Sequence, residues 1–233
     1  MDIALFTQEG LVMILRWIHF FAGVAWIGHL YYLNFVQGAF MPEVEAGVKN
    51  NVFAKLVPRV MFWFRWGAMF TFISGVLMLA ISGHELKSDF FLTPYGIYIY
   101  TGSLLGTLMF LNVWLVIWPR QKILIANGQT ILGGGAANPL AAKVAPEALL
   151  ASRTNVMFSI PLLFFMGASR HLGLNIPEAF SPMAVLSTVT AVILLLQVNA
   201  LKGKLGPMTT VKGVIHCGVG LMVVLYTLIE FVV

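Results

Sequence analysis

Apolar residues dominate the chain in six long stretches, which short polar segments separate. The stretches cover residues 11–36, 60–82, 95–118, 155–172, 181–201 and 211–233. A helix needs about 20 apolar residues to cross the roughly 30 Å hydrocarbon core of a bilayer, and these stretches are close to that length. The pattern predicts an all-α integral membrane protein, a bundle of six transmembrane helices that forms a single domain, 1–233. The fourth stretch is short and contains Pro161, which predicts a kink or a tilt.

Composition agrees with this fold class, because 59% of the residues are hydrophobic and only 10% are charged. A soluble domain usually carries about 25% charged residues. Eleven of the fourteen basic residues fall at one end of the predicted bundle, namely Lys49, Lys55, Arg59, Arg65, Arg120, Lys122, Lys143, Arg153, Lys202, Lys204 and Lys212. The positive-inside rule places this end in the cytoplasm and both termini outside. We therefore expect a multi-pass protein of the bacterial cytoplasmic (inner) membrane. The net charge of +5 is a bias of one face, and no nucleic acid partner is expected.

Several kinds of site are excluded by the sequence. The single cysteine, Cys217, allows neither an internal disulfide nor a paired-cysteine zinc site, and the Cys-x-x-Cys-His motif of covalent c-type haem does not occur. The segment "NGQTILGGGAANP" (127–139) is rich in glycine but lacks the Lys-Ser/Thr of a phosphate loop, which favours a flexible connection. Gly102 and Gly106 are spaced as in a helix-packing face. Trp63, Trp66, Trp114 and Trp118 are expected to form an interfacial aromatic belt.

Two of the apolar stretches carry the same arrangement of a cation, a histidine and a glycine on one helical face. In the first stretch, Arg16, His19, Gly23 and Trp26 follow one another at intervals of 3, 4 and 3 residues. The last stretch contains Lys212, His216 and Gly220 at intervals of 4 and 4 residues.

This arrangement suits a haem that stands edge-on in the membrane. The imidazole would ligate the iron, and the glycine would let the macrocycle approach the helix backbone. The cation would meet the propionates where the haem edge reaches water. An ionisable residue inside a membrane span is a functional candidate by default.

The five histidines divide into two sets by depth. His19, His84 and His171 belong to the outer half of the bundle. His29 lies roughly 15 Å deeper than His19, at the level of His216 in the inner half. We expect His19 and His171 to be the axial ligands of one haem. A second haem between His29 and His216 would have its propionates neutralised by Lys212 and Arg65.

Structural roles for the same histidines remain open. His84 and His171 end their apolar stretches, where a histidine can simply be an interfacial polar residue. His29 can form a hydrogen bond with a backbone carbonyl or with Asn112 across the bundle.

Four segments of the chain resemble the membrane-bound urate hydroxylase family of the PuuD type, in the same order. They are "LRWIHFFAGVAWIG" (15–28), "FRWGAMFTFISG" (64–75), "FLNVWLVIWPRQK" (110–122) and "NVMFSIPLLFFMGASRHL" (155–172). The first segment alone also resembles haem-binding membrane proteins of the HemJ and CopD types, and this resemblance implies haem more than it implies urate. The family pattern includes a C-terminal cytochrome c domain, which this sequence lacks, and a small residue at the position of His29.

Several residues of this chain match positions in the motifs of that family, and the resemblance implies functional roles for them. They are His19 with Arg16, Trp17, Gly23, Trp26 and Gly28; Arg65 and Trp66; Asn112, Trp114, Trp118 and Pro119; and Asn155, Pro161 and His171.

We therefore expect a membrane-embedded protein with one or two b-type haems that transfers electrons in a respiratory chain. Its partners would be membrane lipid and either quinone or a separate cytochrome c, within a larger respiratory complex or a homo-oligomer. Two other classes stay open. One is an oxidase that acts directly on urate or a porphyrinogen, and the other is a haem-free transporter or assembly subunit.

Overall fold

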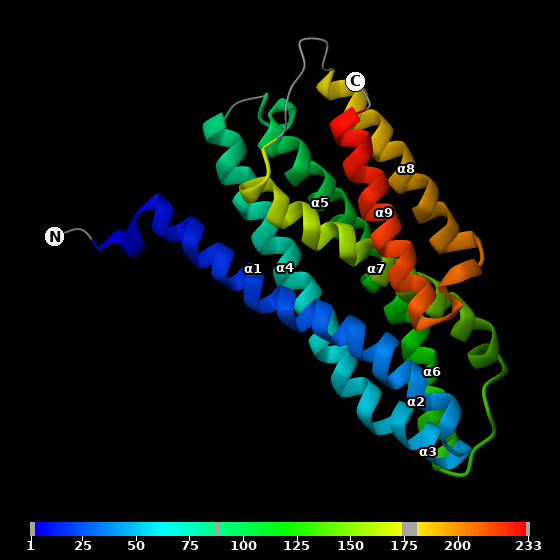
Figure 1. The fold of residues 1–233 in the computed structure, drawn as a ribbon. Helices are drawn as coiled ribbons and strands as arrows, with labels where there is room; N and C mark the ends of the chain where they lie inside the picture. The colour runs from blue at the N-terminus through cyan, green and yellow to red at the C-terminus, as the bar shows by residue number, and fades with distance from the viewer. Residues whose placement is uncertain (1–2, 87–88, 174–180, 232–233) are drawn as a thin grey trace.

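The structure is a computed structural model that describes residues 3–86, 89–173 and 181–231, without the side chains of residues 82–86. All regular elements of this part of the chain are helical (Figure 1). Six helical stretches are long and apolar enough to cross a membrane, which confirms the predicted fold class: Gln8–Glu43, Ala46–Ile81, Pro94–Leu132, Pro139–His171, Pro182–Lys202 and Val211–Phe231.

The first three stretches are each composed of several elements. The first contains α1 (Gln8–Tyr31), the π-helical η2 (Tyr32–Gln37), α2 (Gly38–Phe40) and the 3₁₀ turn η3 (Met41–Glu43). The second contains α3 (Ala46–Asn51), the π-helical η4 (Val52–Leu56) and α4 (Val57–Leu86). The third contains α5 (Pro94–Leu111), the π-helical η6 (Asn112–Ile117) and α6 (Trp118–Leu132).

The last three stretches are single α-helices, α7 (Pro139–His171), α8 (Pro182–Lys202) and α9 (Val211–Phe231). Short 3₁₀ turns complete the order: η1 (Ala4–Phe6), η5 (Phe90–Leu92) and η7 (Gly206–Thr209).

Local sequence explains where several of these helices begin. A polar residue precedes a proline at the start of α5, α7 and α8, as Thr93–Pro94, Asn138–Pro139 and Ser181–Pro182. In each case the polar side chain accepts a hydrogen bond from a backbone N–H of the first turn. A proline in the first helical position costs no hydrogen bond, because an N–H at that position would have no partner within the helix.

The helices form two groups (Figure 1). One is the pair α1 and α4, which pack along each other, and the other contains α5, α8 and α9 around α7. The N-terminal half of α1 diverges from the rest of the bundle, and its apolar side chains, such as Met13 and Trp17, are largely exposed. An exposed apolar surface of this extent on a helix of spanning length is suited to contact with hydrocarbon. The protein is a multi-pass membrane protein.

The central helix is α7, which contacts helices of both groups and is the most buried of the six stretches. The sequence pattern indicated a short span here, whereas α7 has 33 residues and continues through Pro146 and Pro161. Its first half is too poor in large apolar residues to be recognised by hydropathy. Small residues there, such as Ala148 and Ala151, are nevertheless buried in the bundle.

At the basic end of the bundle, the helices extend well beyond the predicted spans. Because α6 continues to Leu132 and α7 begins at Pro139, only residues 133–138 of the glycine-rich segment connect them. Figure 1 shows α2, α3 and α6 together at this end, opposite the C-terminus. Gly128 of α6 allows the close approach, since a Cβ atom there would lie 3.0 Å from Phe53 Cβ and 3.2 Å from the Asn50 carbonyl oxygen.

Two packing predictions have different outcomes. Gly102 and Gly106 do form a close face of α5 against α7, where they contact Met166 and Leu162. The expected aromatic belt stays a prediction, because its four tryptophans differ in exposure. Trp63 and Trp66 are exposed, but Trp114 and Trp118 are half-buried and pack beside the guanidinium of Arg65.

Candidate functional site

His19 lies at the contact between α1 and α4. Its Nδ1 atom is 3.3 Å from the hydroxyl oxygen of Ser74, and its ring packs directly over Gly75. A Cβ atom at position 75 would lie 3.1 Å from His19 Cε1, so any larger residue would require the ring to shift by a few tenths of an ångström. The side chain is half-buried and is held by a neighbouring helix.

The hydrogen bonds of Ser74 favour a proton on Nδ1 of His19. Ser74 has one hydroxyl proton, and it lies within donating distance of two backbone carbonyls, 2.6 Å from Phe70 O and 3.1 Å from Thr71 O. With that proton directed to the backbone, the hydroxyl oxygen accepts from His19 Nδ1–H. The lone pair of the imidazole is then on Nε2, which has no hydrogen-bond partner among the described residues. A metal-binding histidine is commonly oriented in this way.

The remaining residues of the predicted stripe on α1 also face α4, with one exception. The nearest atoms to a Cβ at Gly23 would be those of Thr71, 3.9 Å away, and the backbone of Trp26 lies against Gly67. Trp26 is buried, and its indole N–H has no partner in the described part of the chain. Arg16 is exposed.

His29 and His216 share a simpler local arrangement. Each directs Nδ1 to the backbone carbonyl four residues earlier, at 2.6 Å from Ala25 O and 2.7 Å from Lys212 O. A carbonyl can only accept, so Nδ1–H donates and Nε2 carries the lone pair in both residues. For His29 the predicted alternative of a backbone carbonyl partner is confirmed, and that of Asn112 is wrong.

The predicted stripe on α9 is an exposed face. Lys212, His216 and Gly220 are all exposed, and a Cβ at Gly220 would have no neighbour within 4 Å. No described hydrogen bond or ion pair joins the side chains of any two predicted ligands. The inner pair of His29 and His216 therefore stays a prediction.

Two further histidines, His84 and His171, come at the outer ends of the predicted spans. His171 is the last residue of α7 and is exposed. The side chain of His84 lies outside the described residues. The pairing of His19 with His171 stays a prediction.

Arg65 lies in an aromatic environment at the start of the second apolar span. Its guanidinium carbon is 3.6 Å from the ring centroid of Trp118 and 5.5 Å from that of Trp114, and Nε donates to the carbonyl of Met61 at 3.1 Å. Stacking on an indole is favourable for a cation and leaves some of its N–H donors available.

A buried polar network joins three helices at the centre of the bundle. Asn112 donates to Asn155 Oδ1 at 2.9 Å and to Gln197 Oε1 at 3.0 Å, and Gln197 donates back to Asn112 Oδ1 at 2.7 Å. Asn155 also donates to the carbonyl of Met109 at 3.0 Å. These bonds satisfy polar groups that hydrocarbon could not, and they fix the junction of α5 and η6 relative to α7 and α8.

Two features of the site are absent from the sequence-based prediction. Ser74 and Gly75 position His19, and the only signal for them is that they close the second motif, "FRWGAMFTFISG" (64–75). Arg153 of α7 is the other feature. It is only 7% exposed, its Nε and Nη1 atoms have no hydrogen-bond partner, and no carboxylate lies within 4 Å of it in the described part of the chain. An unpaired buried guanidinium is costly, so a bound anion would stabilise it.

A comparison with protein families identifies the group to which this chain is related. The family model described as "Urate oxidase N-terminal" matches residues 84–227, which is more than half of the chain. This range runs from the end of α4 through most of α9, with His171 and His216 inside it and His19 before it. No curated protein and no solved structure matches the chain. The chain belongs to the urate oxidase N-terminal family, in agreement with the resemblance in sequence.

Proposed function

We propose that this membrane protein of the urate oxidase N-terminal family binds b-type haem and transfers electrons in a respiratory chain. The observation that carries the proposal is the environment of His19. A half-buried imidazole within a membrane helix has its Nδ1 atom held by Ser74, and its Nε2 atom has no partner among the residues that the structure describes. When bound, haem supplies a reversible one-electron iron couple.

The residues present fit such a group in their donor chemistry. His19 and His171 would ligate the iron of an outer haem, and His29 and His216 that of an inner haem. The carboxylates of the propionates would pair with Arg16 on the outer side and with Lys212 and Arg65 on the inner side. Arg153, whose Nε and Nη1 atoms have no partner in the described part of the chain, is a further candidate to bind an anionic group at the basic end.

The surroundings of His19 would act on such a group through solvent exclusion. The α1–α4 contact places an apolar wall beside the imidazole, formed by buried residues such as Ala22 and Trp26. A site of low polarity stabilises the less charged oxidation state of a metal centre. Electrons would pass to or from quinone in the membrane or a separate cytochrome c, and the location would be the bacterial inner membrane.

A visible spectrum of the purified protein tests this function. The reduced-minus-oxidised difference should show the narrow α band of low-spin b-type haem, and His19→Ala should lose it for the outer site. Arg16→Gln, which leaves the imidazole in place, should retain the band and weaken haem retention only. Protein without haem after expression with sufficient haem supply would overturn the proposal and favour the transporter or assembly class.

The family match favours the oxidation of urate as a second, more specific function. Hydroxylation of urate with water as the oxygen source releases two electrons and two protons, and quinone or cytochrome c would take up the electrons. Adding urate to the oxidised protein without oxygen should then reduce the bound haem. Haem that binds and reduces with dithionite but not with urate would leave the electron-transfer proposal in place and exclude urate as the donor.

A further inference from the structure

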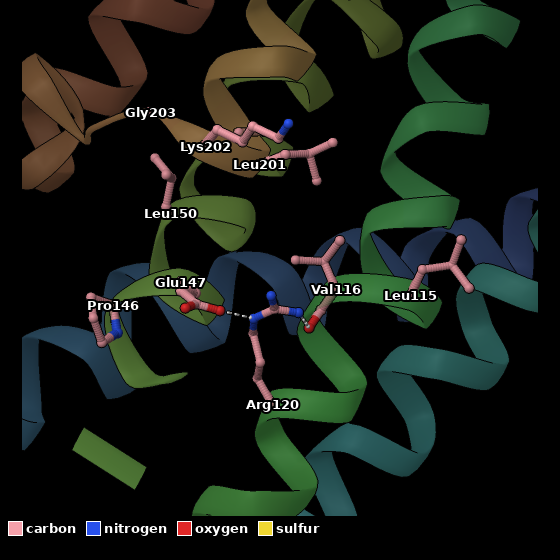
Figure 2. Close-up of a pocket in the computed structure, with 10 residues that line it drawn as sticks. Leu115, Val116, Arg120, Pro146, Glu147, Leu150, Leu201, Lys202 and Gly203 are labelled. Atoms are coloured by element: carbon pink, nitrogen blue, oxygen red, sulfur yellow. Dashed lines mark hydrogen bonds and ion pairs between the residues drawn. The ribbon is translucent and has the colours of Figure 1, made fainter. Parts of the chain in front are cut away.

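A pocket of about 440 Å³ opens at the basic end of the bundle, separate from the predicted haem ligands (Figure 2). Three segments line it: the junction of η6 and α6, the first half of α7, and the C-terminal end of α8. Leu115, Val116 and Arg120 come from the first, Glu147 from the second, and Leu201 and Lys202 from the third. Figure 2 shows Arg120 and Glu147 on one side of the pocket and Lys202 on the other.

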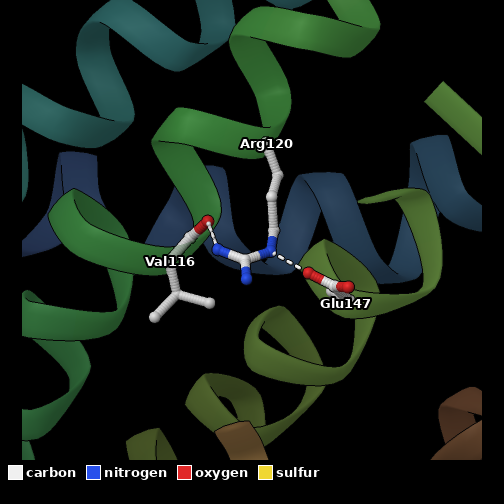
Figure 3. Close-up of polar contacts among 3 residues, drawn as sticks. All are labelled: Val116, Arg120 and Glu147. Carbon is white, nitrogen blue, oxygen red and sulfur yellow. Dashed lines mark hydrogen bonds and ion pairs between the residues drawn. The ribbon is translucent and has the colours of Figure 1, made fainter. Parts of the chain in front are cut away.

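Two hydrogen bonds fix the guanidinium of Arg120 at the pocket wall (Figure 3). Its Nε atom lies 2.6 Å from Glu147 Oε2 as an ion pair, and Nη1 donates to the carbonyl of Val116 at 3.0 Å. The charges of Arg120 and Glu147 cancel in this ion pair. Lys202 has no ion-pair partner among the described residues, so the three charged residues of the lining leave the pocket with a net positive charge.

The pocket crosses the boundary between the apolar spans and the polar ends of the helices. Leu115 and Leu201 lie within the predicted spans and are 66% and 50% exposed. Arg120 and Lys202 lie just beyond the ends of the same spans, at 118 and 201. A ligand in this position would have hydrocarbon on one side and cationic groups on the other.

We propose that this pocket binds one acidic phospholipid, with the phosphate of the headgroup between Lys202 and Arg120 and an acyl chain along Leu115 and Leu201. The net positive charge selects an anionic headgroup over a zwitterionic one. Basic pockets between transmembrane helices on the basic side of a membrane protein are suited to such headgroups. Free inorganic phosphate shares the charge but would gain nothing from the exposed leucines.

Glu147 limits the strength of this site, because its carboxylate occupies Arg120 and repels a phosphate. Removing the carboxylate charge should therefore release the guanidinium for the headgroup. The proposal predicts opposite effects for two neutralising substitutions in one pocket. Lys202→Gln should weaken binding and Glu147→Gln should strengthen it.

Native mass spectrometry of the full chain, released from nanodiscs, tests the proposal. In nanodiscs of mixed dioleoyl phosphatidylglycerol and dioleoyl phosphatidylcholine, the wild type should retain one phosphatidylglycerol. Lys202→Gln should lower its retention about fivefold, the effect of one basic residue near an anionic lipid. Glu147→Gln should raise retention. Lys122→Gln is the matched control, because Lys122 is a basic residue of α6 outside the pocket lining, and it should match the wild type.

Three results would overturn the assignment. The first is equal retention of phosphatidylcholine and phosphatidylglycerol. The second is an identical response of Lys202→Gln and Lys122→Gln. The third is displacement of the lipid by millimolar inorganic phosphate, which would assign the pocket to a soluble anion.

Discussion

The imidazole Nδ1 of His19 lies 3.3 Å from the hydroxyl oxygen of Ser74, so that α4 orients the histidine of α1. The two residues are 55 positions apart in the chain. With the Ser74 proton directed to the backbone, this contact favours the tautomer whose lone pair lies on Nε2, as in a metal-binding histidine.

Ser74→Ala should leave His19 in place but weaken haem binding by about 10- to 100-fold, as expected when a hydrogen bond that orients a ligand is lost. Ser74→Thr retains the hydroxyl and should restore part of the affinity. The measurement is haem titration of the apoprotein, followed at the Soret band. Ser187→Ala, which removes an exposed hydroxyl on α8, serves as the control. Identical affinities for Ser74→Ala and the control would exclude an orienting role for Ser74.

Gly75→Ala should displace the His19 ring, because the new Cβ would lie 3.1 Å from Cε1. Gly23→Ala is the matched variant on the opposite helix, where the nearest atoms lie 3.9 Å away and a methyl group fits. Without haem, Gly23→Ala should be about as stable as the wild type, whereas Gly75→Ala should be about 1–3 kcal/mol less stable because of the tight contact. A loss of haem affinity in Gly23→Ala would then indicate that a bound ligand occupies the space over Gly23. Unchanged ligation in Gly75→Ala would mean that His19 does not bind the iron in the orientation described.

The polar network at Asn112 should contribute measurably to stability. Asn112→Ala removes the described partner of Asn155 Oδ1 and of the Gln197 side-chain amide, which should cost about 1–3 kcal/mol of the free energy of unfolding. In the double variant with Gln197→Ala the cost should be less than the sum of the single costs. Asn51→Ala, an exposed asparagine at the basic end, should change stability by less than about 0.5 kcal/mol. Thermal unfolding in detergent measures these differences, and additive single costs would contradict a shared network.

The orientation of the bundle can be tested by cysteine labelling in a Cys217→Ala background. The charge bias predicts that residues 133–138 are cytoplasmic and that the N-terminus is outside. Ala136→Cys and Ile3→Cys are suitable positions, since both side chains are exposed, whereas Gly134 has φ +81° and would strain a cysteine. An impermeant maleimide added to intact cells should label position 3 only. Labelling of position 136 in intact cells would reverse the topology.

The haem count tests the predicted inner site. If His29 and His216 ligate a second iron, the wild type should hold two haems per chain, and His216→Ala should hold one while keeping the spectrum of the outer site. The exposed face of Lys212, His216 and Gly220 would then be covered by the second haem. Pyridine haemochrome analysis gives the ratio. One haem per chain in both proteins would mean that His216 does not ligate iron and only forms a hydrogen bond with the Lys212 carbonyl.

The sequence alone was sufficient to predict the six helices, because hydropathy depends on neighbouring residues. The caps at Thr93, Asn138 and Ser181 were not predicted, although each is a local hydrogen bond that spans two or three residues. Helical periodicity likewise placed Arg16, His19, Gly23 and Trp26 on one face of α1. The extent of α7 was missed, since its first half is buried by packing of small residues and not by an apolar composition.

Contacts between helices were decided by the tertiary structure alone. Periodicity cannot state which neighbour a helical face meets, so the roles of Ser74 and Gly75 beside His19 became visible only when α1 packed on α4. The pairing of Asn112 with Asn155 and Gln197 depends in the same way on three helices that are distant in sequence. The physical reason is that helix formation is satisfied by hydrogen bonds within each segment, whereas side-chain partners are chosen by the shapes and polar groups that packing brings together.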